Sequence, residues 1–352
     1  MDYLIPLSCS FFVSFLVIRW IIPVAEKVGL VDIPTGRKQH NGRVPLIGGF
    51  AIYLSVMTTS LIFIPDNQSL NIYLVSASLI LFIGILDDKY DIPVRYRLVA
   101  QVIVASMMIF GAGLYLKDLG DLLGFGFISL GFVGVFITVI AVIGAINAFN
   151  MVDGIDGLAG MLSLITFAGL AFLLSRVGSD WYLLPMLFIA ALVAYLMFNL
   201  GWPNKILRKV FMGDAGSMLI GLTVVWLLVI GVDDSGVNAF RPVTALYLIA
   251  IPLMDMAAIM LRRINKGDSP FKPDRDHLHH IFMRAGFSPL QSLAIISVCA
   301  SIFAFIGVLS ELYLVPEAIM FIGFLVIFAL YSYAIQHAWQ IISTFRNLMR
   351  RT

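Results

Sequence analysis

Long apolar runs separated by short polar breaks make up almost the whole sequence. Eleven runs are long enough to cross about 30 Å of hydrocarbon as helices. Their approximate ranges are 3–24, 45–64, 70–86, 98–116, 130–150, 157–175, 182–201, 216–232, 242–261, 290–309 and 317–337. Strands of a membrane barrel would instead alternate in hydrophobicity over about ten residues. The pattern predicts an all-α polytopic membrane protein with about eleven transmembrane helices, in which residues 1–352 form a single integral-membrane domain.

Composition supports this interpretation. Hydrophobic residues make up 60% of the chain and charged residues 12%, with a mean hydropathy of +0.97. A soluble domain carries roughly 25% charged residues. Cys9 and Cys299 both fall in predicted spans, so neither a disulfide framework nor a zinc site is expected. The first run lacks a preceding basic segment and a small-residue cleavage site, so it is expected to be retained as a span.

Lysine and arginine residues are concentrated in alternate breaks. We call the face reached by the breaks after odd-numbered runs the odd face, and the opposite one the even face. The odd face holds 19 of the 23 basic residues and the even face holds three. Because cytoplasmic loops are enriched in basic residues, the odd face is predicted to be cytoplasmic, with the N-terminus outside and the C-terminus inside.

The distinctive polar motifs fall on the same face. They occupy residues 32–49, 87–97, 147–160, 209–217 and 269–280. The even-face breaks are short and carry no comparable motif. Independent loops would scatter such residues over both faces, so their convergence predicts one active site in a cytoplasm-facing cleft.

The motif NAFNMVDGIDGLAG places Asn150, Asp153 and Asp156 three residues apart, with a glycine directly after each acid. Hard oxygen ligands on a glycine-rich turn suit Mg²⁺ and allow a phosphate to approach the backbone. The same acids could instead cap the helix that begins here. Both interpretations stay open from this motif alone.

A second motif, DDxxD, is formed by Asp87, Asp88 and Asp91 at the odd-face end of the third run. A carboxylate at membrane depth costs about 2.5–3.5 kcal/mol, and adjacent carboxylates repel each other. Water, a bound cation or the nearby Arg95 and Arg97 would compensate for this cost. The motif is either a solvated loop or a participant in metal–phosphate chemistry, including the role of a base for a phosphate nucleophile.

The segment GDAGS places Asp214 among small residues where the eighth run begins. This acid could cap the helix, or it could be a further metal carboxylate beside a helix N-terminus that faces an anion. Phe211 could stack on a nucleobase, although an aromatic residue at a membrane edge is also a common packing or interface residue.

His277, His279 and His280 share a break with Arg275. Three histidines suggest zinc, but no cysteine or distant histidine pair completes a tetrahedral set. Imidazole and guanidinium groups both donate hydrogen bonds to phosphate or sugar oxygens, so polyanion recognition is favoured over an exposed polar loop. Asp255, inside the ninth run, is interpreted as either a functional acid or a structural partner of this break.

Together these motifs indicate phosphoryl transfer, which needs chiefly positioning and charge neutralisation, with a lipid as one substrate. An intramembrane prenyltransferase would need a second aspartate-rich motif, which GDAGS and HLHH do not supply. A transporter would place its site near the bilayer midplane between repeats. Here the ionisable residues cluster at one edge, and the sequence shows no internal repeat.

The motifs, in this order, resemble those of the polyprenyl-phosphate N-acetylhexosamine-1-phosphate transferases. The likeness runs through GLVDIPTGRKQHNG, ILDDKYDI, NAFNMVDGIDGL, VFMGDAGS, IPLMDMAAIM and SPFKPDRDHLHHIFMRAGF, which is essentially the whole chain. It is closest to the bacterial branch that transfers GlcNAc-1-phosphate from UDP-GlcNAc to undecaprenyl phosphate and releases UMP. The resemblance implies a multi-pass enzyme of the bacterial cytoplasmic (inner) membrane that starts a cell-surface polysaccharide such as the O-antigen of lipopolysaccharide.

The resemblance also implies a metal and two substrate-binding regions. Mg²⁺, replaceable by Mn²⁺, would be bound by Asp214 and Asn150. Asp87 and Asp88 would activate or orient the lipid phosphate and Arg97 would hold it. Nucleic acid is not an expected partner, and a homodimer is compatible with a sequence that does not fix the oligomeric state.

On the donor side, the resemblance places Asp153 and Asp156 beside the nucleotide, and Gly154 and Phe211 around the uracil. Arg275 and the histidines would contact the pyrophosphate or sugar. The expected catalytic residues are Asp87, Asp88, Asp156 and Arg275, and the expected substrate-binding residues are Asp153, Gly154, Phe211, Arg97, Asp91, His277, His279 and His280.

Overall fold

The computed structural model describes residues 3–33, 42–203, 206–233, 238–269 and 277–337. The described chain is almost entirely helical, apart from a short antiparallel pair of strands, β1 (Val31–Asp32) and β2 (Val44–Pro45). The helices are α1 (Leu4–Val28), α2 (Gly48–Phe63), α3 (Gln68–Tyr90), α4 (Val94–Ser106), α5 (Val133–Val152), α6 (Leu158–Arg176), α7 (Leu183–Leu200), α8 (Gly213–Val232), α9 (Pro242–Leu248), α10 (Ala250–Asn265), α11 (Leu278–Ala285), α12 (Pro289–Leu312) and α13 (Glu317–Gln336). A π-helical turn, η1 (Met107–Gly111), continues α4, and a 3₁₀ turn, η2 (Asp180–Tyr182), precedes α7.

The structure confirms an all-helical, polytopic membrane protein. Within its described ranges, nine helical segments are long and apolar enough to span a membrane, and ten if α9 and α10 are taken as one bent span. The predicted count of eleven is not reached, because the predicted span 45–64 forms only the 16-residue helix α2. Such a helix is about 24 Å long. The first residues of the predicted span are not helical, since Pro45 belongs to β2 and Leu46 pairs with Phe211.

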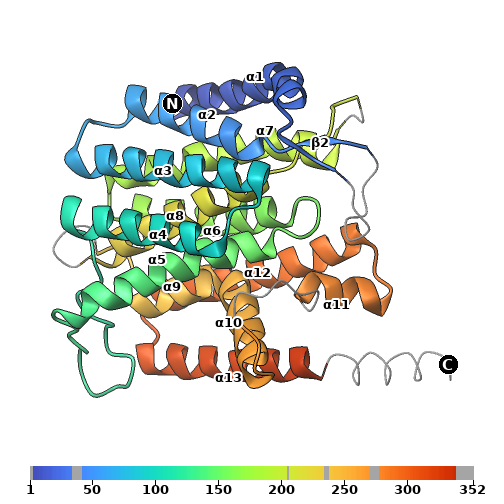
Figure 1. Cartoon of the computed structure of the whole chain (residues 1–352). Helices are drawn as coiled ribbons and strands as arrows, with labels where there is room; N and C mark the ends of the chain where they lie inside the picture. Colours follow the sequence, from blue (N-terminus) through green and yellow to red (C-terminus); the bar gives the residue numbers. More distant parts are fainter. Residues whose placement is uncertain (1–2, 34–41, 204–205, 234–237, 270–276, 338–352) are drawn as a thin grey trace.

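The predicted span 242–261 is broken, because α9 and α10 meet at 84°. Pro252 lacks the N–H group that would bond to the carbonyl oxygen of Leu248, four residues earlier. The hydroxyl of Thr166 donates to that oxygen instead, at 3.0 Å. A neighbouring side chain therefore satisfies the backbone group freed by the break, as a low-dielectric interior requires. As a result, α10 runs across the direction of the other helices (Figure 1).

Helix α8 forms the centre of the bundle, and α2, α3 and α5 all pack against it. Its most apolar 18-residue window is 94% buried, as expected for a helix that is hydrophobic on all sides. The close approach at its N-terminal end depends on glycine. A Cβ on Gly49 would lie 2.2 Å from the nitrogen of Gly216, and one on Gly84 would lie 2.3 Å from the Cα of Ala215. The first turn of α8 is thus held between the start of α2 and the end of α3.

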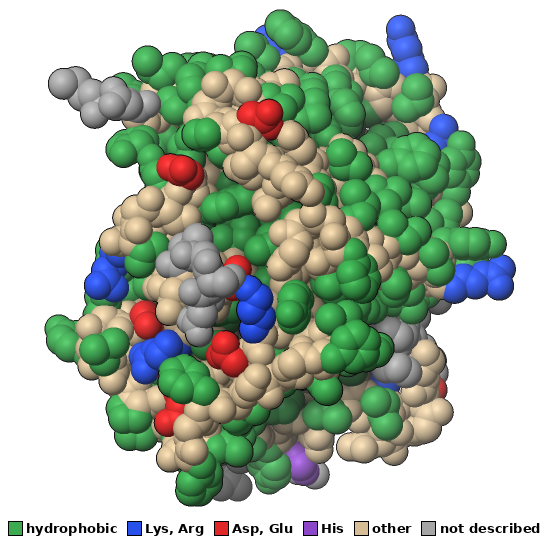
Figure 2. All heavy atoms as spheres, turned by 90° about the vertical axis from the view of Figure 1, so that its left-hand side faces the viewer, with side chains coloured by type: hydrophobic (Ala, Val, Ile, Leu, Met, Phe, Trp, Pro, Cys, Tyr) green, Lys and Arg blue, Asp and Glu red, His purple; other side chains and the backbone are tan. Residues whose placement is uncertain are grey.

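The end of the bundle that carries β2 and α11 lies on the right in Figure 1. The opposite end, which corresponds to the even face, is more polar than the sequence predicted. There Glu311 pairs with Arg241 at 3.2 Å and accepts from the hydroxyl of Thr244 at 2.5 Å, while Glu317 accepts from the backbone N–H of Asp121 at 3.1 Å. Figure 2 shows acidic and basic side chains together on this end and largely hydrophobic flanks. The even-face breaks carry no comparable motif in the sequence, yet the fold gathers a polar cluster there from residues far apart in the chain.

Candidate active site

The end of α3 and the start of α4 bring an acid and an arginine together. Asp87 is buried, and its Oδ2 accepts from Nη1 of Arg97 at 2.7 Å. Its Oδ1 accepts from the backbone N–H of Ile92 at 3.0 Å. The same Nη1 of Arg97 lies 3.8 Å from Oδ2 of Asp214. One guanidinium therefore links the DDxxD and GDAGS motifs, as expected if both belong to a single site.

Asp214 also contacts the NAFNMVDGIDGLAG motif. Its Oδ1 accepts from the Asn150 amide at 2.7 Å, and that amide also donates to the hydroxyl oxygen of Ser217 at 3.0 Å. Ser217 was not among the predicted site residues. Its position three residues after Asp214, on the same side of the first turn of α8, is the signal that could have identified it.

Asp88 lies beside the N-terminus of α8 rather than free in the site. Its Oδ1 accepts from the backbone N–H of Asp214 at 2.7 Å, and its Oδ2 from that of Ala215 at 3.2 Å. These are two of the N–H groups that a helix start leaves without a partner within the helix. Asp88 therefore caps α8 from another helix, and Gly213 leaves room for it, because a Cβ there would lie 2.4 Å from Oδ2 of Asp88.

Asp156 forms an ion pair with Lys209, whose Nζ lies 2.5 Å from Oδ2 of the acid. The same Nζ lies 5.1 Å from the ring centroid of Phe211, a cation–π contact. No role was predicted for Lys209. Its place two residues before Phe211, in the segment that runs into α8, was the available signal.

Asp153 follows the end of α5 and completes what we call the acidic cluster, namely Asp87, Asp88, Asp153, Asp156 and Asp214. Burial of Asp153 raises its pKa to about 7, and the negative charges of Asp214 and Asp156 act in the same direction. The cluster contains five acids, and Arg97 and Lys209 are paired with it. A negative site of this kind favours binding of a further cation.

The histidine segment, residues 277–280, packs directly against the loop after α5. A Cβ on Gly154 would lie 2.1 Å from Nε2 of His279, so glycine is required for this approach. His279 is buried, and its Nε2 has no hydrogen-bond partner among the residues that the structure describes. Burial lowers the pKa of His279 to about 3, with further lowering from His280 and His277, so the ring is neutral near pH 7.

The three imidazole rings lie side by side, with the ring of His280 tilted by 48° from that of His279. His277 and His279 are nearly parallel, with centroids 5.8 Å apart, and the centroids of His279 and His280 are 4.2 Å apart. Among the residues that the structure describes, no three histidine, cysteine, aspartate or glutamate side chains are arranged to hold a metal ion.

Two predicted residues stand apart from the others, one by its position and one because it lies outside the described ranges. Asp91 is exposed and ends α3 in a left-handed conformation, and within the described chain no hydrogen bond or ion pair links its side chain to the cluster. Arg275 lies outside the described residues.

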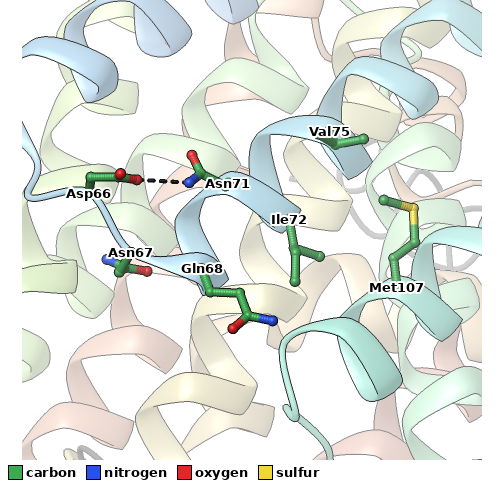
Figure 3. Close-up of a pocket in the computed structure, with 7 residues that line it drawn as sticks. All are labelled: Asp66, Asn67, Gln68, Asn71, Ile72, Val75 and Met107. Atoms are coloured by element: carbon green, nitrogen blue, oxygen red, sulfur yellow. Dashed lines mark hydrogen bonds between the residues drawn. The ribbon is translucent and has the colours of Figure 1, made fainter.

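A cavity of about 610 Å³ lies away from these residues, where α3 begins and beside Met107 at the start of η1. Figure 3 shows Asp66 bonded to Asn71, with Gln68, Ile72 and Met107 nearby. The lining combines one acid with amides and apolar groups, without a basic residue or a second acid. The acidic cluster is therefore the candidate active site, and this cavity is not.

The helical fold defines a polytopic membrane protein, and the acidic cluster lies at one end of its bundle. Comparison of the sequence with known families gives the specific assignment. The profile of the family described as "Glycosyl transferase family 4" matches residues 70–232, from the start of α3 to the end of α8. This range contains the whole acidic cluster.

Curated relatives match over nearly the full length. The undecaprenyl-phosphate alpha-N-acetylglucosaminyl 1-phosphate transferase of Pasteurella multocida is 45% identical over 99% of this chain and 98% of its own. The proteins of the same name are 44% identical in Haemophilus influenzae, over 97% and 96%, and 45% identical in Escherichia coli K12, over 93% and 89%. The chain belongs to glycosyl transferase family 4.

Proposed function

We propose that this protein transfers GlcNAc-1-phosphate from UDP-GlcNAc to undecaprenyl phosphate, giving undecaprenyl-diphosphate-GlcNAc and UMP. Near-full-length similarity to relatives named for this reaction supports the choice of substrates. The observation that carries the proposal is the joint placement of Asp87, Arg97, Asp214 and Asn150 within one set of contacts. Phosphoryl transfer depends on this kind of charge neutralisation and alignment.

Mg²⁺ fits the side chains around Asp214 and Asn150. This ion prefers oxygen ligands, keeps several waters and is typically held by one or two carboxylates together with substrate phosphates. Asp214 is partly exposed, with 39% of its side chain accessible, and it lies beside an amide whose oxygen becomes a second ligand when the amide turns over. When bound, the ion would neutralise charge on the donor diphosphate.

We assign the acceptor phosphate to the side formed by Asp87 and Arg97. A phosphate oxygen of the lipid attacks the phosphorus that bears the sugar, a new P–O bond forms, and the bond to the UMP oxygen breaks with its electron pair leaving on UMP. Direct attack is favoured, because both oxygens of Asp87 already accept hydrogen bonds and the lipid phosphate is itself anionic. Arg97 supplies positive charge to the incoming phosphate.

We assign the donor to the side formed by Asp153, Gly154, Asp156 and Phe211, with Lys209 between the last two. Phe211 would stack on the base, and Lys209 would exchange its contacts with Asp156 and the Phe211 ring for the diphosphate. The histidine segment, with Arg275 before it, would face the pyrophosphate or sugar. Because nucleotide sugars are cytoplasmic, this assignment goes with a cytoplasmic odd face.

The test is UMP release by purified protein in detergent with UDP-GlcNAc, undecaprenyl phosphate and Mg²⁺. Turnover is expected with UDP-GlcNAc in preference to UDP-GalNAc or UDP-MurNAc-pentapeptide. Asp214→Ala is expected to abolish turnover together with metal dependence. Asp87→Asn is expected to retain donor binding in calorimetry while turnover collapses. Absence of UMP release with every donor would refute the proposed function.

A further inference from the structure

Asp255 is a buried acid outside the acidic cluster that joins three helices. It lies in α10 and is 1% exposed. Its Oδ1 accepts from the hydroxyl of Tyr331 in α13 at 2.8 Å and from the backbone N–H of Leu278 at 3.0 Å. Its Oδ2 lies 2.8 Å from Nδ1 of His277. One carboxylate thus contacts α13, the first residue of α11 and the residue that precedes α11.

These contacts fix both the backbone and the ring at the start of the histidine segment. His277 occupies the N-cap position of α11, and its own side chain makes no capping bond. The carboxylate of Asp255 takes over that function by binding the N–H of Leu278. A carboxylate on Nδ1 also selects the imidazole form with a proton on Nδ1, which leaves Nε2 for a ligand.

His277 contacts the donor side of the proposed site through His279. Its ring lies within 7° of parallel to that of His279. His279 in turn lies against Gly154, in the loop between Asp153 and Asp156. A rotation of His277 would disturb its parallel packing on His279, and the close approach of His279 to Gly154 leaves no space for His279 to move toward the loop.

We propose that Asp255 is a positioning residue for the histidine segment, acting through His277 and held in place by Tyr331. The inference rests on the proposed function, in which the histidine segment faces the donor. A buried carboxylate in a membrane helix is costly unless it is fully paired. Two of its contacts, with His277 and Leu278, position the histidine segment, and the third, with Tyr331, holds Asp255 itself in place.

The experiment is a double-mutant cycle between Asp255→Asn and His277→Gln, read as kcat/KM for UDP-GlcNAc. Asp255→Asn is expected to lower this value about 10–100-fold, the size of effect found when the partner that orients a metal-bound imidazole is removed. The KM for undecaprenyl phosphate is expected to stay within about twofold. In the His277→Gln background, the same change is expected to cost less than about threefold, because its target is already missing.

Tyr331→Phe provides a second variant that keeps the buried charge. It is expected to lower kcat/KM for the donor about fivefold, the equivalent of one neutral hydrogen bond. Tyr333→Phe is the matched control on the same helix, since Tyr333 is 61% exposed. Asp233→Asn is the control for loss of an acid, because Asp233 pairs with Lys117 at 2.7 Å on the even face. Both controls are expected to retain wild-type kinetics.

Three results would overturn the positioning role. These are wild-type donor kinetics in Asp255→Asn, additive losses in the cycle, and equal losses for donor and acceptor accompanied by a lower Tm. If Asp255→Asn fails to fold, wild-type donor kinetics in Tyr331→Phe would overturn the proposal by themselves. Lack of UMP release by the wild-type protein would instead refute the proposed function, so the two failures are distinguishable.

Discussion

The substitution Gly49→Ala tests whether the active site depends on the contact between α2 and α8. Gly49 lies in the first turn of α2, and its N–H donates to the carbonyl oxygen of Met212 at 3.0 Å. An added Cβ would lie 2.2 Å from the nitrogen and 2.3 Å from the Cα of Gly216. Both contacts are with backbone, so no side-chain rotation relieves them.

The size of the displacement follows from these distances. Ordinary van der Waals contact begins at 3.4 Å, so the two backbones must separate by about 1.2 Å. Asp214 lies two residues before Gly216 and would move with the first turn of α8, away from its hydrogen bonds to Asp88 and Asn150. Overpacking of this kind costs about 1–3 kcal/mol in stability. A misplacement of about 1 Å lowers turnover by about 10²-fold.

The assay is UMP release at saturating Mg²⁺, together with thermal unfolding in the same detergent. Gly144→Ala is the matched control, because Gly144 also lies in a helix but an added Cβ would have its nearest contact with the Met256 side chain at 3.8 Å. The control is expected to retain activity with an equal or higher Tm, since alanine favours a helix by up to about 1 kcal/mol over glycine. Wild-type turnover in Gly49→Ala would refute the reasoning that α2 sets the position of Asp214.

Three further outcomes follow from the site. Because the pKa of Asp153 is raised to about 7, above its unfolded value of about 4, the folded protein holds a proton there that the unfolded chain releases. The stability of the metal-free protein should therefore fall as the pH rises from about 4 to about 7. Asp153→Asn should reduce this dependence of Tm on pH in thermal unfolding. An unchanged dependence in the variant would contradict the prediction. Lys209→Met should raise the KM for UDP-GlcNAc and leave that for the lipid unchanged, and steady-state kinetics showing the reverse would move Lys209 to the acceptor side. Arg97→Lys should lower kcat at least about tenfold, because an ammonium cannot reproduce the guanidinium contacts with two acids; retained turnover would show that Arg97 acts only as a point charge.

The sequence was sufficient to predict the class of protein, because each membrane span is determined by the hydrophobicity of one local segment. The free energy of transferring each apolar run into the membrane depends on that run alone. In the described chain, nine of the eleven predicted spans therefore correspond to single helices long and apolar enough to cross a membrane, and a tenth corresponds to the bent pair α9 and α10. The same reasoning could not predict that Pro45 pairs with Val31 in the small sheet and Leu46 with Phe211, so that neither residue belongs to a spanning helix. It also could not predict the bend between α9 and α10, because whether Pro252 breaks the helix before it depends on a partner such as Thr166.

The sequence alone also identified the motifs, since acids within and beside apolar runs are rare enough to stand out. What each acid does was decided by tertiary contacts. Asp87 and Asp88 are neighbours with the same chemistry, yet one faces Arg97 and the other caps α8. Asp255 looked equally like a functional or a structural acid until α11 and α13 were placed against it. Residue type and hydropathy fix which groups enter the membrane edge, but the direction of a carboxylate and its partner depend on how the helices pack, which is a property of the whole chain.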